Sequence, residues 1–188
     1  MLGQAMRTLQ RWQQSHPELS ISVNVSTRDL QDPGFFQRVR DGLTERAINP
    51  DKLRLEIVES GLMQDTHASI VLMHRLTDLG VQLSIDDFGT GYSSLAYLQQ
   101  LPVTELKIDR SFIIDINAQP MSQRLVKTMI DMGHGMDLLV TAEGIETAAE
   151  RDTLKALGCD VMQGYFGSRP LFGDRLQAWF DGLAKPVA

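Results

Sequence analysis

The sequence of 188 residues has a single cysteine, Cys159, and no long apolar run. One cysteine excludes a disulfide framework and a zinc site built on several thiolates, and it is typical of a reducing compartment such as the cytoplasm. No stretch approaches the roughly 18 apolar residues of a membrane-spanning helix, and the first residues lack the apolar core of a signal peptide. We therefore expect a cytoplasmic domain without direct membrane insertion, whose parent protein could still be membrane-anchored.

Basic residues are also scarce, with 18 Lys and Arg against 24 Asp and Glu and a net charge of -6. Such a balance is a poor electrostatic match for duplex nucleic acid or an anionic membrane, although metal ions could still bring a phosphate ligand to it. Apolar residues make up 43% of the chain, and no low-complexity segment or linker interrupts it. These features predict one globular domain over residues 1–188.

Short apolar or β-branched runs alternate with amphipathic helical stretches along the chain. The runs cover residues 21–25, 53–58, 81–85, 103–108, 137–142 and 159–163. The helical stretches cover the first residues and 35–46, 65–79, 122–133, 147–157 and 173–182. This alternation predicts βαβ units and a parallel sheet of six strands. Periodicity alone fits both a doubly wound sheet and a (β/α) barrel.

Each predicted strand ends next to a polar side chain. These side chains are Asn24, Glu56 with Glu59, Asp86 with Asp87, Lys107 with Asp109, Glu143 with Glu146, and Gln163. Successive positions lie 20 to 36 residues apart, which is about one βα unit. The recurrence favours a barrel, because the reactive groups of (β/α) barrels gather at the C-terminal ends of the strands.

Simpler explanations exist for the individual residues. A single acidic residue at a strand end is most often a helix N-cap or a solvated charge. The residues from Asn24 to Thr27 also fit a turn with a cap, and Lys107 with Asp109 fits a surface ion pair of little energetic consequence. These explanations lose force because a polar side chain follows all six predicted strands.

Six carboxylates at the C-terminal end of one barrel would repel one another, and the single positive charge of Lys107 cannot neutralise them. They are Glu56, Glu59, Asp86, Asp87, Glu143 and Glu146. An all-oxygen set without cysteine or paired histidine suits Mg²⁺ or Mn²⁺ rather than zinc. Pairs of such ions commonly hydrolyse phosphodiesters, and the adjacent Asp86 and Asp87, expected on a loop, could serve both.

The most specific segment is DDFGTGYSSL at residues 86–95, where two glycines flank Thr90 directly after the two aspartates. It matches neither a dinucleotide-binding fingerprint nor the motif set of a protein kinase. Five further motifs accompany it: NVS (24–26), LEIVES (55–60), LKIDRSFI (106–113), TAEGIET (141–147) and QGYFGSRPL (163–171). In this order, and over essentially the whole chain, the set resembles the EAL-type cyclic-di-GMP phosphodiesterase family.

The resemblance implies a TIM-like barrel that hydrolyses cyclic di-GMP to linear pGpG with two Mg²⁺ or Mn²⁺ ions per site. Matched motif by motif, Asn24, Glu56, Asp86 and Asp87 correspond to metal ligands. Glu143 corresponds to the residue that acts as general base or as a ligand orienting the attacking water, and Lys107 to the lysine that steadies phosphate charge or a bound water. Glu146 and Gln163 correspond to pocket residues, and Glu59 to the glutamate that holds the glycine loop.

One departure from the family is clear, because no Glu-Ala-Leu tripeptide occurs in the chain. The opening helix resembles the one that follows the strand bearing that tripeptide in the family. We therefore expect an N-terminally truncated domain with about six of the eight strands, exposed sheet edges and weak or absent activity as an isolated chain. A second copy covering those edges would make a homodimer, and the parent protein is expected to carry sensory or diguanylate-cyclase modules.

Two other function classes remain open. A non-catalytic cyclic-di-GMP receptor or protein-interaction module would also fit a domain that lacks strands. A barrel glycosidase with paired carboxylates would need neither metal nor dinucleotide, and the Asp86-Asp87 pair before a glycine loop argues against it.

Overall fold

The computed structural model describes residues 1–59, 66–91 and 95–183. Its centre is one sheet of six parallel strands, whose spatial order β1-β2-β3-β4-β5-β6 follows the order along the chain. The strands are β1 (Ile21–Val25), β2 (Leu53–Val58), β3 (Gln82–Phe88), β4 (Glu105–Ile108), β5 (Leu139–Ala142) and β6 (Val161–Met162). A parallel sheet in sequential order is the arrangement of a (β/α) barrel.

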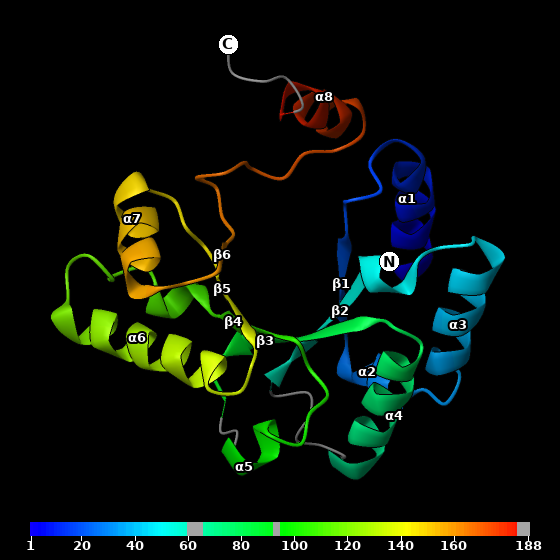
Figure 1. Ribbon diagram of the computed structural model, residues 1–188, viewed down its shortest axis with the longest axis horizontal. Coiled ribbons are helices and arrows are strands. Elements are labelled where there is room, and N and C mark those ends of the chain that lie inside the picture. Colours follow the sequence, from blue (N-terminus) through cyan, green and yellow to red (C-terminus); the bar gives the residue numbers. More distant parts are fainter. Residues whose placement is uncertain (60–65, 92–94, 184–188) are drawn as a thin grey trace.

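Helices connect the strands and lie around the outside of the sheet (Figure 1). They are α1 (Leu2–Ser15), α2 (Thr27–Gln31), α3 (Phe35–Glu45), α4 (Thr66–Asp78), α5 (Leu95–Leu98), α6 (Pro120–His134), α7 (Ala148–Leu157) and α8 (Asp174–Leu183). Two 3-10 turns, η1 (Pro50–Lys52) and η3 (Arg110–Phe112), precede β2 and follow β4. Within these described ranges, no helix combines the length and the apolar character needed to cross a bilayer.

The predicted elements are confirmed within about two residues, with three differences. Strand β3 continues three residues beyond the predicted 81–85, so Asp86 and Asp87 lie on a strand rather than on the expected loop. The short helices α2 and α5 were not predicted. Gly158 ends α7 with a φ of 90°, a left-handed conformation that glycine adopts without strain.

The two faces of the sheet differ in chemistry. Leu53, Leu55 and Ile57 of β2 are at most 1% exposed and pack with residues of the neighbouring strands under the helices. The alternate residues Arg54 and Glu56 point to the other face, because successive strand residues face opposite sides. The helix-covered face therefore forms the hydrophobic core, and the inner face of the curved sheet carries the polar groups.

The sheet is an incomplete barrel, as predicted. Among the described residues, β1 pairs only with β2 and β6 only with β5, so both edges stay open. After β6 the chain runs in an extended segment to α8, which lies near α1 (Figure 1). The rings of Trp12 on α1 and Phe180 on α8 meet edge-on with centroids 5.2 Å apart. Aromatic packing thus holds the last helix close to the first one.

Candidate active site

A buried lysine lies at the centre of the site. Lys107 is the third residue of β4 and is 3% exposed. Its ammonium group lies 2.6 Å from Glu143 Oε1, 2.9 Å from Glu56 Oε1 and 3.1 Å from Asp86 Oδ1. One side chain from β4 therefore contacts acidic groups at β2, at β3 and after β5. This geometry excludes the surface ion pair with Asp109, whose carboxylate instead caps the turn η3 at Ser111.

The acidic partners of Lys107 stabilise its positive charge. Burial alone would lower the pKa of the ammonium group, but the hydrogen bonds and charges of Glu143 and Glu56 outweigh it and raise the pKa above its usual range. The lysine therefore remains a cation in contact with three carboxylates. Removing it would leave those carboxylates buried without a counterion.

Asp86 and Asp87 share the site because of a distortion in β3. The pairing register between β3 and β4 shifts between Ile85 and Phe88, and Asp87 has a φ of 55°. Adjacent residues of a regular strand point to opposite faces, whereas a bulge with a left-handed residue turns one side chain around. Both aspartates therefore reach the same edge of the sheet, although neither is on a loop.

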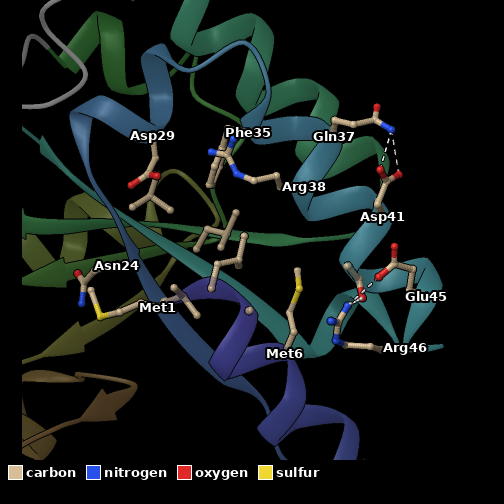
Figure 2. Close-up of a pocket in the computed structure, with 16 residues that line it drawn as sticks. Met1, Met6, Asn24, Asp29, Phe35, Gln37, Arg38, Asp41, Glu45 and Arg46 are labelled. Carbon is tan, nitrogen blue, oxygen red and sulfur yellow. Dashed lines mark hydrogen bonds and ion pairs between the residues drawn. The ribbon is translucent and has the colours of Figure 1, made fainter.

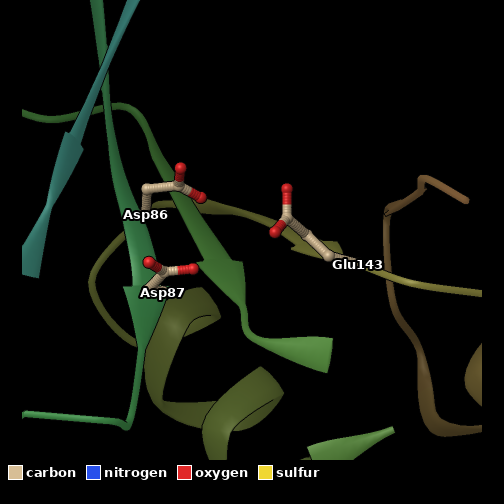
Figure 3. Close-up of side chains that lie close together, drawn as sticks. All are labelled: Asp86, Asp87 and Glu143. Carbon is tan, nitrogen blue, oxygen red and sulfur yellow. The ribbon is translucent and has the colours of Figure 1, made fainter. Parts of the chain in front are cut away.

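Three carboxylates converge at this point. One oxygen each from Asp86, Asp87 and Glu143 lies within 4.8 Å of the other two, and Figure 3 shows the three groups facing one another. Burial raises the pKa of Asp87, and the negative charges of Asp86 and Asp109 raise it further. The pKa of Glu143 is also raised, chiefly by burial, against the opposing effect of Lys107. The cluster carries more negative charge than its lysine balances.

The cluster fits a hard divalent cation. Asp86 Oδ1 is buried and, within the described residues, has no hydrogen-bond partner, although Lys107 Nζ lies 3.1 Å away. A bound cation would satisfy that oxygen and reduce the repulsion among the carboxylates. The converging donors are all oxygens, the ligand type that Mg²⁺ and Mn²⁺ prefer.

Asn24 lies on β1 and Gln163 directly follows β6, at the two edges of the sheet. Asn24 pairs in register with Glu56, and its side chain is exposed. It borders a cavity of about 610 Å³ between α1, β1 and α3, where Met1 lies beside it (Figure 2). Gln163 follows β6 with an exposed side chain, and its carbonyl accepts a hydrogen bond from the Ile145 amide at 3.1 Å. Within the part of the chain that the structure describes, neither side chain forms a hydrogen bond with the acidic cluster.

Glu59 contacts the glycine loop after β3. It is 3% exposed, and its Oε2 accepts hydrogen bonds from the amides of Gly89 at 3.0 Å and Gly91 at 3.3 Å. A Cβ on Gly91 would come within 2.9 Å of this carboxyl group, so the contact requires a glycine. The later loop residues 92–94 lie outside the described residues. The buried carboxylate thus links the end of β2 to the loop that follows the two aspartates.

The strand order, the lysine-centred cluster and the glycine loop agree with a comparison to known proteins. The family model described as "EAL domain" matches residues 1–170. The chain belongs to the EAL domain family. The fold prediction of an incomplete TIM-like barrel and the recognition of the family are therefore both confirmed.

Curated relatives of this EAL chain are much longer than the chain itself. It is 39% identical over 179 residues to the bifunctional diguanylate cyclase/cyclic di-GMP phosphodiesterase MucR of Pseudomonas aeruginosa, covering 95% of this chain and 26% of MucR. It is 43% identical over 156 residues to the cyclic di-GMP phosphodiesterase NbdA of the same organism, covering 83% of this chain and 20% of NbdA. The chain thus spans about a quarter or less of these relatives.

Solved EAL structures superpose closely. The phosphodiesterase of P. aeruginosa MucR in complex with cyclic di-GMP gives a TM-score of 0.89 at 39% identity, covering 93% of this chain and 71% of that one. The EAL domain of Mycobacterium smegmatis DcpA gives 0.91 at 34% identity, covering 98% of this chain and 84% of that one.

Two residues beside the EAL site were not assigned a role from the sequence. Arg110 Nη2 lies 2.7 Å from Glu146 Oε1, so Glu146 is an exposed ion-pair partner and is not one of the three converging carboxylates. Asp109 acts on the pKa of Asp87 by its charge. The sequence did contain a signal for both residues, because they directly follow the strand that carries Lys107 and so lie at the same end of the sheet as the site.

Proposed function

We propose that this chain carries the cyclic-di-GMP phosphodiesterase site of an EAL protein, that the site hydrolyses cyclic di-GMP to linear pGpG in a metal-dependent reaction, and that the isolated chain has weak or absent activity. The observation that carries the proposal is the contact of Lys107 with Glu56, Asp86 and Glu143 beside the converging carboxylates of Asp86, Asp87 and Glu143. The names of MucR and NbdA, and the bound cyclic di-GMP in the MucR structure, support it.

We assign the metal ligands to Asn24, Glu56, Asp86 and Asp87, and the ions to two Mg²⁺ or Mn²⁺. Held there, the cations would supply Lewis-acid stabilisation of phosphate oxygens and lower the pKa of a water molecule. Asp86 and Asp87 suit such binding because the bulge in β3 brings both to one side. Asn24 and Glu56 lie side by side in register on β1 and β2, which keeps their oxygens at the same level of the sheet.

Glu143 is the proposed general base. Its raised pKa makes the carboxylate a better proton acceptor, and the ammonium of Lys107 fixes its orientation. The water oxygen forms a bond to phosphorus, Glu143 takes the water's proton, and one P–O3′ bond breaks. The leaving 3′ oxygen gains a proton, which opens the cyclic dinucleotide to pGpG. Lys107 steadies the negative charge that gathers during this exchange.

The other predicted site residues have supporting roles in this proposal. Gln163 and Glu146 border the pocket from the strand end after β6 and from the loop after β5. Glu59 holds the glycine loop through the amides of Gly89 and Gly91. Its carboxylate thereby limits the movement of the segment that follows Asp86 and Asp87.

The test is incubation of the chain with cyclic di-GMP and Mn²⁺, with pGpG measured by chromatography. Asp87→Asn should lower turnover by about 10²-fold or more, because a ligand is lost. Asp131→Asn removes an exposed carboxylate that pairs with Lys127 on α6 and should leave turnover unchanged. Measurable wild-type turnover that Asp87→Asn leaves unchanged would refute the proposed metal site.

A second candidate function is that of a non-catalytic cyclic-di-GMP receptor or protein-interaction module. The open edges at β1 and β6 favour it, since the exposed side chains of Asn24 and Gln163 both lie on those strands' ends. Calorimetric titration of cyclic di-GMP in Ca²⁺ separates the two candidates. Binding in Ca²⁺ without any hydrolysis in Mn²⁺ would select the receptor.

We further propose that a second copy of the chain pairs with these edges to form a homodimer, because unpaired strand edges tend to acquire a partner. Light scattering that gives a monodisperse monomer would contradict this.

The parent protein is proposed to join the EAL domain to sensory or diguanylate-cyclase modules, as the bifunctional name of MucR suggests. A cytoplasmic location of the domain agrees with the free thiol of the buried Cys159.

A further inference from the structure

Arg110 makes an unusually close contact with the loop that carries Glu143. The arginine begins the turn η3 after β4, and its side chain crosses the backbone of Gly144, the residue directly after Glu143. A Cβ on Gly144 would lie 2.3 Å from Arg110 Cγ and 2.7 Å from its Cβ and Cδ. Gly144 also has a φ of 75°, so the contact and the backbone conformation both require glycine.

The guanidinium end of Arg110 fixes the other end of the same loop. Its Nη2 lies 2.7 Å from Glu146 Oε1. The Glu146 amide donates to Glu150 Oε2 at 2.8 Å, and Glu150 takes part in the capping box with Thr147 that starts α7. Glu146 is therefore tied to the start of a helix, and Arg110 connects that helix to the turn after β4.

Strand β4 also holds Glu143 directly. Its amide donates to the carbonyl of Ile108, the last residue of β4, at 3.1 Å. Its carboxylate reaches Lys107 Nζ on the same strand at 2.6 Å. The backbone between Glu143 and Glu146 thus lies over the end of β4, and Arg110 packs on its middle.

We propose that Arg110 is a positioning residue that clamps residues 143–147 on the end of β4 and so orients the Glu143 carboxylate in the acidic cluster. Among the described residues, Arg110 forms no hydrogen bond or ion pair with the proposed metal ligands, and it acts through Gly144 and Glu146. The part of this inference that concerns metal affinity depends on the proposed function. The part that concerns the loop does not.

The chain offers a matched control for the ion pair. Arg38 Nη1 lies 2.7 Å from Asp32 Oδ2, and the two side chains are 50% and 42% exposed. The Arg110–Glu146 pair has the same distance, with exposures of 52% and 45%. Arg38→Ala therefore removes a surface pair of equal distance and similar exposure on α3, which contributes no residue to the acidic cluster. Arg110→Lys keeps the aliphatic stem and the charge, and it should restore part of the function lost in Arg110→Ala.

The first measurement is amide hydrogen exchange of residues 143–147 in metal-free protein. We expect exchange to rise about tenfold in Arg110→Ala, less in Arg110→Lys and not at all in Arg38→Ala. Unchanged exchange in Arg110→Ala would overturn the inference, whatever the protein binds or hydrolyses. A crystal structure of Arg110→Ala in which Glu143 keeps its contact with Lys107 would overturn it as well.

The second measurement is Mn²⁺ affinity, from the free-ion signal in electron paramagnetic resonance. Arg110→Ala should weaken Mn²⁺ binding about tenfold, as happens in other metal sites when a residue that orients a metal ligand is removed. Arg38→Ala should bind Mn²⁺ as wild type does. Faster exchange with unchanged Mn²⁺ affinity would overturn the positioning role. A wild-type chain that binds no Mn²⁺ would refute the proposed metal site, and exchange and the crystal structure would then decide the role of Arg110.

Discussion

The inner face of the sheet holds two buried ionic clusters that differ in their charge balance. In the first, Lys107 contacts the carboxylates of Glu56, Asp86 and Glu143. In the second, which lies nearer the start of the strands, Arg54 Nη1 is 2.9 Å from Glu105 Oε2. The second cluster therefore has one cation for one carboxylate, while the first has one cation for three.

The balanced cluster also has a neutral partner. Thr141 Oγ1 donates a hydrogen bond to the second oxygen of Glu105. Among the described residues, Arg54 Nε, Glu105 Oε2 and Asp86 Oδ1 are all buried without a hydrogen-bond partner, so the two clusters differ in net charge and not in unpaired atoms. Surplus charge of this kind costs stability and is typical of a functional site, whereas a balanced pair serves the fold.

The largest effect that would sharpen this comparison is expected from Lys107→Met. The substitution leaves three carboxylates without their cation, so the metal-free protein should lose about 3–5 kcal/mol of unfolding free energy. Urea denaturation measures the loss, and added Mn²⁺ should recover part of it. Lys127→Met removes an exposed helix pair and should change stability by less than about 0.5 kcal/mol. Equal losses in the two variants would break the comparison.

A smaller effect is expected from Glu105→Gln in the balanced cluster. The side-chain oxygen of the new amide would still accept the hydrogen bond from Thr141, and the partly exposed Arg54 side chain can turn to water. We therefore expect the free energy of unfolding to fall by about 1–3 kcal/mol. The gain in melting temperature on adding Mn²⁺ should equal that of wild type. Glu45→Gln, at an exposed pair with Arg46, serves as the control and should be near neutral. Loss of the Mn²⁺ effect in Glu105→Gln would show that the two clusters act as one.

The smallest effect concerns an acid outside both clusters. Partial burial would raise the pKa of Asp160, but hydrogen bonds from the Val140 amide and from His134 lower it below its ordinary 3.8. Its contribution to stability is thus present above pH 3.8 and is lost as pH falls through the lowered value. Asp160→Asn should remove that acid dependence, an effect below about 1 kcal/mol at this partly exposed pair. Acid unfolding of both proteins, followed by circular dichroism, would test this prediction. An equally steep loss of structure with falling pH in Asp160→Asn and in wild type would contradict it.

Much of the fold could be predicted because its periodicity is local. The alternation of buried and polar residues in LRLEIV, and Gly158 at the end of α7, each depend on a few neighbouring residues. The family resemblance predicted the site residues as a set, and the structure brings Glu56, Asp86, Asp87, Lys107 and Glu143 together.

The rest depends on contacts between strands. The sequence pattern placed Asp86 and Asp87 on a loop because it shows no bulge, which arises only when β3 shifts its register against β4. Arg110 was missed for the same reason, since its partners Gly144 and Glu146 lie on the following βα unit. Periodicity says which face a residue occupies, but not which distant residue it meets there.

The strand order has a consequence for how the molecule tolerates change. Each described strand pairs through its backbone only with its neighbours, much as repeats do in a solenoid, so a disturbance of the pairing is passed from one strand to the next and weakens with distance. Lys107 and its three partners occupy β2, β3, β4 and the loop after β5, so that the edge strands β1 and β6 lie beyond them on the two sides. The edges can therefore gain a strand, lose a partner or fray, while the charged centre keeps its geometry.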